Sequence, residues 1–145
     1  MRYQAATLLF AAGVLAAVGT ATPVRAHHAF AAEFDSTQPI TLRGSVTRVE
    51  WINPHTWIHL DVKDSSGKVI EWMIEGGTPN TLLRRGVDKN SLPAGTEIVV
   101  EGYRAKNGTN RANGRDLTLP NGRKLFLGSS GTGAPSDGKD PTETK

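Results

Sequence analysis

The clearest alternation of apolar and polar residues runs through positions 56–75, in two segments that a glycine-containing turn separates. The apolar positions of the two segments are Ile58, Leu60 and Val62, and then Ile70, Trp72 and Ile74. A period of two residues is typical of a half-buried β-strand. If the turn is Ser65-Ser66-Gly67, with Gly67 in the left-handed conformation, the two apolar rows lie opposite each other in a β-hairpin. The pattern therefore predicts one shared core.

The other face of this hairpin carries polar and aromatic side chains. In the same register Trp57 lies opposite Glu75, and His59 lies opposite Met73. An Asn-Pro pair at 53–54 stands just before the strand, and proline removes a ladder donor and disfavours helical backbone at the residue before it. We therefore expect a chain corner at 53–54, followed by a strand whose outer face is a display surface.

A longer strand precedes the hairpin. The apolar residues between Ile40 and Trp51 change phase after Val46, because Val49 falls on the opposite alternation, and Gly44 is nearby. A change of phase within one strand indicates a bulge or a barrel-corner bend. The sequence therefore predicts that this strand bends between Val46 and Val49.

A break and a short helix follow the hairpin. Two glycines at 76–77 end the strand. Residues 78–86 then predict a helix with Thr78 as N-cap, a proline in the first turn and a closing glycine. Leu82 and Leu83 of this helix are expected to plug one end of a barrel.

The remaining segments define the fold class. Residues 97–104 predict a strand, and the segments 116–119 and 123–127 flank an Asn-Gly turn, a strong hairpin signal. The order β-β-β-α-β-β, with a bent first strand, favours an all-β fold with one short helix, a small OB-like Greek-key barrel over residues 40–128. An SH3-like barrel and an open sheet stay as alternatives, because strand pairing is not visible in a sequence.

The start of the chain has the features of a secretory signal peptide over residues 1–26. An apolar run from Ala5 to Val18 follows a basic start and precedes small residues. We expect cleavage after Ala26, with cleavage after Ala21 as the alternative, and a periplasmic or secreted mature protein. A transmembrane anchor is not expected, because the run is shorter than the roughly 20 residues that span a bilayer.

Two further segments flank the barrel. Residues 27–39 have no clear strand or cap signal, and we expect them to lie as an N-terminal arm across the domain. Residues 129–145 have a single alanine as their only apolar side chain apart from proline. Such a segment buries too little surface to offset its ordering entropy, which predicts a disordered tail.

Charge and composition exclude several classes of function. The 145 residues include 17 Lys and Arg against 14 Asp and Glu, and Arg2 and Arg25 belong to the leader. The nearly neutral mature chain lacks the electrostatic footprint of a nucleic-acid binder. The chain has no cysteine, which excludes a disulfide framework, a thiolate metal site and a cysteine nucleophile. We expect a monomer that a packed core stabilises.

Several short motifs together resemble a known family. They are His27-His28-Ala29-Phe30 after the leader, the run from Glu50 to His55, Glu75-Gly76-Gly77, the basic helix that ends at Gly86, the run from Glu101 to Lys106, and Asn113-Gly114-Arg115. Over about residues 27–128 the chain resembles a family of small exported bacterial proteins known only as a domain of unknown function. The resemblance implies export and a compact β fold. It supplies no activity and no established catalytic residues that could be carried over.

The histidines offer the most specific chemistry. If cleavage makes His27 the first residue, its α-amine and imidazole form a chelate that suits Cu(II), and in this terminus alone the chain resembles the histidine-brace copper proteins. His28 and a strand histidine would complete a nitrogen site. We favour His55, beside the Asn-Pro corner, and place His59, next to Met73, second. Copper is the expected metal, with zinc after it.

A less specific interpretation of the same histidines stays open. The pair His27 and His28 would then be a solvated terminus, and His55 would only fix the corner through hydrogen bonds.

Trp57 is the other candidate on the outward face. A side chain of this size is usually covered or used, so we expect Phe30 or Phe34 of the arm to pack on it. Alternatively, Trp57 and Glu75 form a binding face, because OB barrels bind ligands over strands two and three. The corresponding function is a non-catalytic module that binds another exported protein or a saccharide. No hydrolase, phosphate-loop or dinucleotide motif is present, and we assign no catalytic residues.

Overall fold

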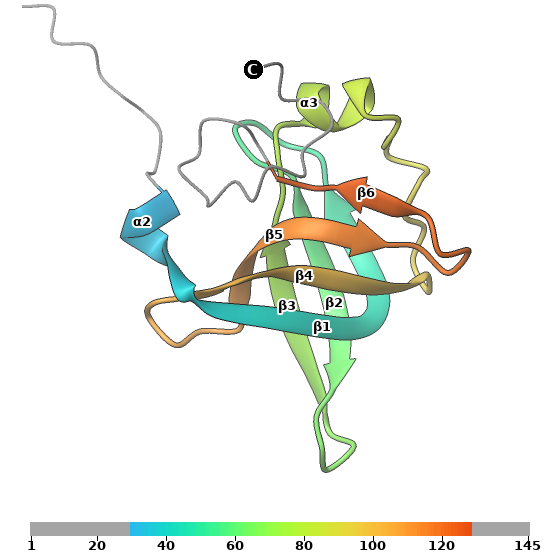
Figure 1. Cartoon of the computed structure of the whole chain (residues 1–145). Helices are drawn as coiled ribbons and strands as arrows, with labels where there is room; N and C mark the ends of the chain where they lie inside the picture. The colour runs from blue at the N-terminus through green and yellow to red at the C-terminus, as the bar shows by residue number, and fades with distance from the viewer. Residues whose placement is uncertain (1–29, 129–145) are drawn as a thin grey trace, which may run out of the picture.

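The structure, a computed structural model, describes residues 30–128, in which five strands close into a barrel and a sixth lies along its rim (Figure 1). The elements are α2 (Phe30–Glu33), β1 (Phe34–Glu50), β2 (Trp57–Lys63), β3 (Val69–Glu75), α3 (Pro79–Arg84), β4 (Glu97–Ala105), β5 (Arg111–Thr118) and β6 (Lys124–Phe126). No helix within this described range is long and apolar enough to cross a membrane.

The strand pairing is that of an OB-type Greek key. The long strand β1 pairs with β4 through its first part and with β2 through its second, while β2 pairs with β3 and β4 with β5. A parallel pairing of β3 with β5 closes the ring, and β6 adds to the other edge of β5. The predicted all-β barrel with one helix between the third and fourth strands is therefore confirmed.

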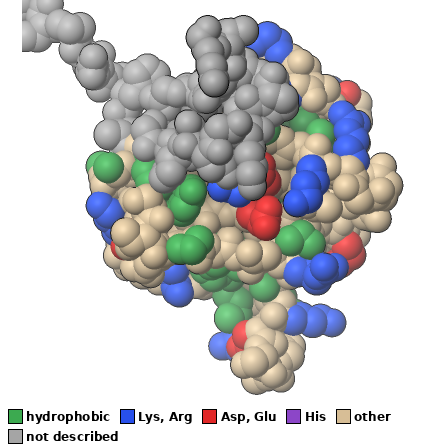
Figure 2. Space-filling view, in the orientation of Figure 1, with side chains coloured by type: hydrophobic (Ala, Val, Ile, Leu, Met, Phe, Trp, Pro, Cys, Tyr) green, Lys and Arg blue, Asp and Glu red, His purple; other side chains and the backbone are tan. Residues whose placement is uncertain are grey.

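The central hairpin has the predicted register. Leu60 lies opposite Trp72 and Ile58 opposite Ile74, and Gly67 adopts the left-handed conformation with φ 85°. The core contains the predicted inward side chains together with residues from every other strand and from the α3 region. Its fully buried members include Val46, Ile58, Leu60, Ile74, Leu82, Val87, Ile98, Val100, Leu117 and Leu127. The tip of the hairpin stands clear of the barrel (Figures 1 and 2).

The predicted bend of β1 is also confirmed. The pairing of β1 with β2 shifts register between Val46 and Arg48, at the position where the apolar phase changes. Gly44 just before it is required sterically, because a Cβ at this position would lie 2.2 Å from the backbone oxygen of Asp61. The bend lets one strand serve two sides of the barrel.

The helix α3 is confirmed, but only one of its leucines plugs the barrel. The hydroxyl of Thr78 accepts a hydrogen bond from the amide of Thr81, as an N-cap does, and Gly86 ends the turn with φ 78°. Leu82 is fully buried, whereas Leu83 is 53% exposed. On so short a helix only one of two adjacent side chains can face the core.

Two strands begin earlier than predicted. β1 starts at Phe34, so residues 34–39, which the sequence placed in an arm, open the strand that pairs with β4. β5 starts at Arg111 rather than at 116, although Asn113-Gly114 has the composition of a turn. Gly114 is needed there for packing, because a Cβ would lie within 2.8 Å of side-chain atoms of Leu127 and Ile74. The predicted leader and tail lie outside the described residues.

Candidate functional site

The loop between β1 and β2 positions the first of the strand histidines. The Asn53-Pro54 peptide bond is cis, which makes the predicted corner. The amide of Thr56 donates to the carbonyl of Gly77, and the amide of Gly76 donates to the carbonyl of Thr56. These two bonds place His55 directly over the end of β3.

One ring nitrogen of His55 is held by two acceptors. Nδ1 lies 3.3 Å from the carbonyl oxygen of Gly76 and 3.7 Å from Oε1 of Glu75, and the side chain is 14% exposed. A carbonyl oxygen only accepts, so Nδ1 carries the proton. In the neutral ring Nε2 then carries the lone pair. No group among residues 30–128 forms a hydrogen bond with Nε2.

The carboxylate of Glu75 is buried beside this ring. Glu75 is 7% exposed, and the side-chain amide of Asn113 donates to its Oε1 at 3.4 Å. Burial raises the pKa of Glu75 above its ordinary value, and the charge of Glu33 acts in the same direction. His55, Asn113 and Arg111 oppose this rise of the pKa.

Trp57, at the start of β2, is covered by the guanidinium of Arg111. The guanidinium of Arg111 lies 4.7 Å from the centre of the Trp57 ring, and it contacts the carboxylate of Glu33 at 3.5 Å. Sequence analysis placed neither Arg111 nor Asn113 in the site, because both lie in the part of β5 that has the composition of a turn. The parallel closure of β3 with β5 brings them to the site.

The predicted packing of the arm on Trp57 is wrong. Phe30 and Phe34 are 4% and 3% exposed and form a separate cluster with Tyr103 and Ala105. The rings of Phe30 and Tyr103 meet edge to face with centroids 5.4 Å apart. Because β1 begins at Phe34 and pairs with Ala105 of β4, the two phenylalanine rings pack on β4 and not on Trp57.

The second strand histidine has a different environment. His59 faces outward by alternation and lies opposite Met73, as predicted, but its side chain is only 1% exposed. Nδ1 lies 2.8 Å from Oε1 of Glu71, and Nε2 lies 2.8 Å from Oε1 of Glu50. Both ring nitrogens are therefore engaged. The expectation of an open display surface is wrong at this position, because side chains from β1 and β3 close over it.

The structure therefore brings His55 and Trp57 beside Glu75, whereas His59, two residues beyond Trp57, has its own carboxylate partners, Glu50 and Glu71. His27 and His28 lie outside the described residues. Within residues 30–128 no group of three or more His, Cys, Asp or Glu side chains is arranged to hold a metal ion.

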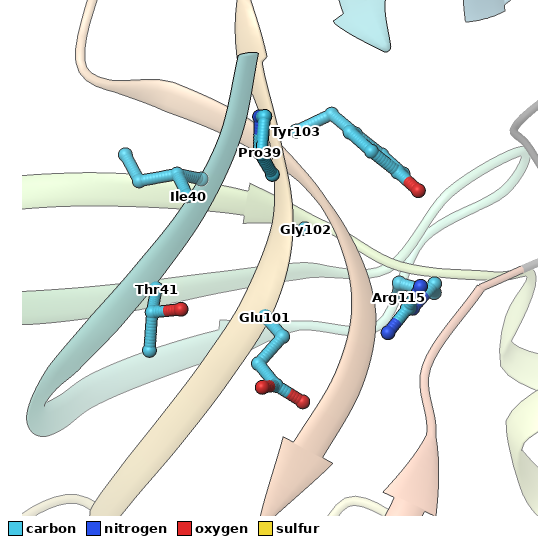
Figure 3. Close-up of a pocket in the computed structure, with 7 residues that line it drawn as sticks. All are labelled: Pro39, Ile40, Thr41, Glu101, Gly102, Tyr103 and Arg115. Atoms are coloured by element: carbon cyan, nitrogen blue, oxygen red, sulfur yellow. The ribbon is translucent and has the colours of Figure 1, made fainter. Parts of the chain in front are cut away.

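A hollow of about 130 Å³ lies elsewhere, between β1, β4 and β5 (Figure 3). Its lining residues are Pro39, Ile40, Thr41, Glu101, Gly102, Tyr103 and Arg115. The register of β1 shifts between Phe34 and Pro39 and that of β4 between Glu101 and Gly102, so irregular strand pairing borders the hollow on two sides.

These features define a small OB-type barrel protein with a histidine and a buried glutamate at one end of its β2–β3 face. The profile of a family of unknown function, DUF6152, matches residues 14–114, and the chain belongs to this family. No curated protein and no solved structure matches the chain significantly.

Proposed function

We propose that the protein is exported and binds a divalent metal ion, Cu(II) in the first place and Zn(II) in the second. The ligands are the α-amine and imidazole of His27, released as the first residue by cleavage after Ala26, together with His28 and His55. These groups supply nitrogen donors and no thiolate, a set that suits Cu(II) by ligand type and by the Irving–Williams order.

The observation that carries the proposal is the orientation of His55. Protein histidines that bind metals commonly donate the other ring N–H to a carbonyl or carboxylate, which fixes the tautomer and the ring. Nδ1 of His55 has both kinds of acceptor, Gly76 and Glu75, at 3.3 and 3.7 Å. Nε2 then carries the lone pair, and no group within residues 30–128 hydrogen-bonds to it.

The path of the chain supports the same donor set. Glu33, at the end of α2, reaches Arg111, which stacks on Trp57 two residues after His55. His27 precedes Phe30 by three positions, a contour length of up to about 10 Å. The contact of Glu33 with Arg111 supports a donor set that includes the segment before Phe30.

His59 and Met73 are not part of this proposal. Both nitrogens of His59 are already hydrogen-bonded to carboxylates, and a metal would have to displace one of them. His55 has no such competition at Nε2 among the described residues.

The test is a Cu(II) titration of three forms: the processed protein that begins at His27, the same protein with one alanine added before His27, and His55→Ala. We expect both changes to weaken binding at least tenfold, because each removes a donor. Affinity must also fall with pH through the range in which imidazole and α-amine gain protons, about 6.5 and 8. Equal affinity of the extended form would contradict the role of the N-terminus. Unchanged affinity of His55→Ala would contradict the role of the strand ligand.

A second candidate is the non-catalytic binding of a saccharide. The hollow in Figure 3 combines the ring of Tyr103 with the charged groups of Glu101 and Arg115, which are side chains that sugar hydroxyls recognise. Its volume is below the roughly 300–1,000 Å³ of drug-sized ligand sites, so a single sugar ring is the largest ligand that we propose. NMR titration with monosaccharides tests it. Shifts confined to residues around the hollow, and lost in Glu101→Gln, would support it, and the absence of shifts would refute it.

A further inference from the structure

Four side chains from three strands surround His59 in a compact cluster. Arg48 and Glu50 come from β1, His59 from β2 and Glu71 from β3. Nη2 of Arg48 lies 3.0 Å from Nε2 of His59 and 3.1 Å from Oε1 of Glu50. The ring itself is almost completely buried, whereas Glu71 and Arg48 are more than half exposed on their side chains. The cluster is therefore a buried imidazole under charged groups that reach solvent.

The proton count of the ring decides which of these contacts are favourable. A carboxylate only accepts, so the two 2.8 Å contacts require an N–H on both ring nitrogens, which only the charged imidazolium has. The neutral ring keeps one N–H. With that proton on Nδ1, bonded to Glu71, the lone pair of Nε2 accepts from Arg48, and its contact with Glu50 becomes a repulsion between two acceptors.

The group that the neutral ring releases is the last residue of β1. Glu50 is followed directly by the loop at 51–56, which carries His55 and is fixed at its far end through Thr56. The same loop leaves Trp51 Nε1 and Thr56 Oγ1 buried with no hydrogen-bond partner within the described range. Leaving a buried polar atom without a partner costs free energy, which works against this conformation of the loop.

We propose that Arg48, Glu50, His59 and Glu71 form a proton-operated latch for the loop at 51–56. With the imidazolium present, His59 holds Glu50 of β1 and Glu71 of β3 at once, and the loop is fixed at both ends. When the ring loses its proton, Glu50 leaves the ring and the near end of the loop is released. The cluster thus has two hydrogen-bonded states, which is what a histidine switch requires.

Two other charged residues, Asp61 and Arg111, lie near the cluster. Asp61 follows on the same face of β2, lies opposite Glu71 and adds a negative charge beside the cluster. Arg111 of β5 lies opposite Met73, the cross-strand partner of His59, and adds a positive charge. The proposal does not depend on metal binding, because no proposed ligand belongs to the cluster.

The test is an NMR pH titration of the metal-free protein in the His55→Gln background, in which the loop has no histidine of its own. We expect the ring nitrogens of His59 to show an N–H at both positions on the acidic side. The amide signals of residues 51–53 and 55 should move with the same midpoint as the ring; residue 54 is a proline and has no amide proton. Adding Glu50→Gln should remove most of this amide response, whereas Glu97→Gln, an exposed strand carboxylate on β4, should leave it unchanged.

Two results would overturn the latch. One is an Nε2 that stays unprotonated while Nδ1 is protonated, a measurement that needs no substitution in the cluster and holds even if Glu50→Gln fails to fold. The other is a set of loop amides that do not follow the ring of His59, or that follow it equally well in Glu50→Gln.

Discussion

The two strand histidines stand four residues apart, and each has a glutamate partner, yet the two pairs are opposite in character. Beside His59, hydrogen bonds from Arg48 and His59 hold the pKa of Glu50 below its ordinary value. Beside His55, burial raises the pKa of Glu75 above its ordinary value. The first glutamate reaches solvent and is surrounded by donors, whereas the second is buried with one amide donor at 3.4 Å.

The difference shows what decides the role of a histidine on a barrel face. The ring of His59 is enclosed because the bulge in β1 directs Arg48 and Glu50 over it. His55 precedes the first paired residue of β2, and among the described strands the end of β3 and the start of β5 are the ones that adjoin this position. The ring nitrogens of His59 are both hydrogen-bonded by neighbouring side chains, whereas only Nδ1 of His55 has a hydrogen-bond partner within residues 30–128. Substitutions at the two histidines and at their glutamate partners test this difference.

The largest expected effect is on His59→Ala. It removes two 2.8 Å hydrogen bonds and leaves a buried space between three strands, so we expect a loss of about 2–3 kcal/mol in the free energy of unfolding. His55→Ala removes one longer bond and should cost about 1 kcal/mol or less. Urea denaturation of both variants at neutral pH measures the difference. Equal losses would show that the two histidines are equivalent structural groups.

The next effect is on the pH dependence of stability in the metal-free protein. Because the folded pKa of Glu50 is lowered, its stabilisation is present above the unfolded pKa near 4.5 and is lost as the pH falls through the folded pKa. The folded pKa of Glu75 is raised, so its ionisation costs stability, and this cost disappears as the pH falls through the folded pKa.

The two conservative variants should therefore have opposite profiles. Glu50→Gln should be less stable than the natural protein at neutral pH and should converge with it in acid. Glu75→Gln should have its most favourable free energy of unfolding, relative to the natural protein, at neutral pH, and this difference should shrink in acid. Urea denaturation from about pH 3 to pH 7 provides the measurement. If the stability of both variants changed with pH in the same direction relative to the natural protein, the opposite pKa shifts of Glu50 and Glu75 would be contradicted.

The smallest effect is on the stacking of Arg111 on Trp57. Arg111→Gln removes a cation about 4.7 Å from the ring centre and should cost about 0.5–1 kcal/mol. It should also change the fluorescence of Trp57, while Arg43→Gln, an exposed arginine elsewhere on β1, should do neither. A variant with unaltered emission would show that Arg111 does not cover the ring in solution.

The sequence predicted the fold well because its signals are local. Alternation set the register of the β2–β3 hairpin, and the change of phase after Val46 located the bend of β1. Thr78 and Gly86 marked the ends of the helix region, and the Asn-Gly pair at 121–122 marked the last hairpin. Each of these features depends on residues close together in the chain.

The site was less predictable because its contacts are between distant segments. His59 could be placed on the outer face by alternation, but its burial depends on where the bend directs Glu50. Arg111 reaches Trp57 only through the parallel closure of β3 with β5, which no local pattern indicates. The turn-like composition of Asn113-Gly114 also hid the beginning of β5.

The projecting tip of the β2–β3 hairpin offers a place for a reporter group. Ser65 is exposed there, and a Cβ on the neighbouring Gly67 would meet no atom within 4 Å. Since the chain has no cysteine, Ser65→Cys creates a single thiol for a spin label or dye. The strands that carry the label run directly to both histidines, so one labelled protein can report on the proposed metal site and on the latch without a change to either.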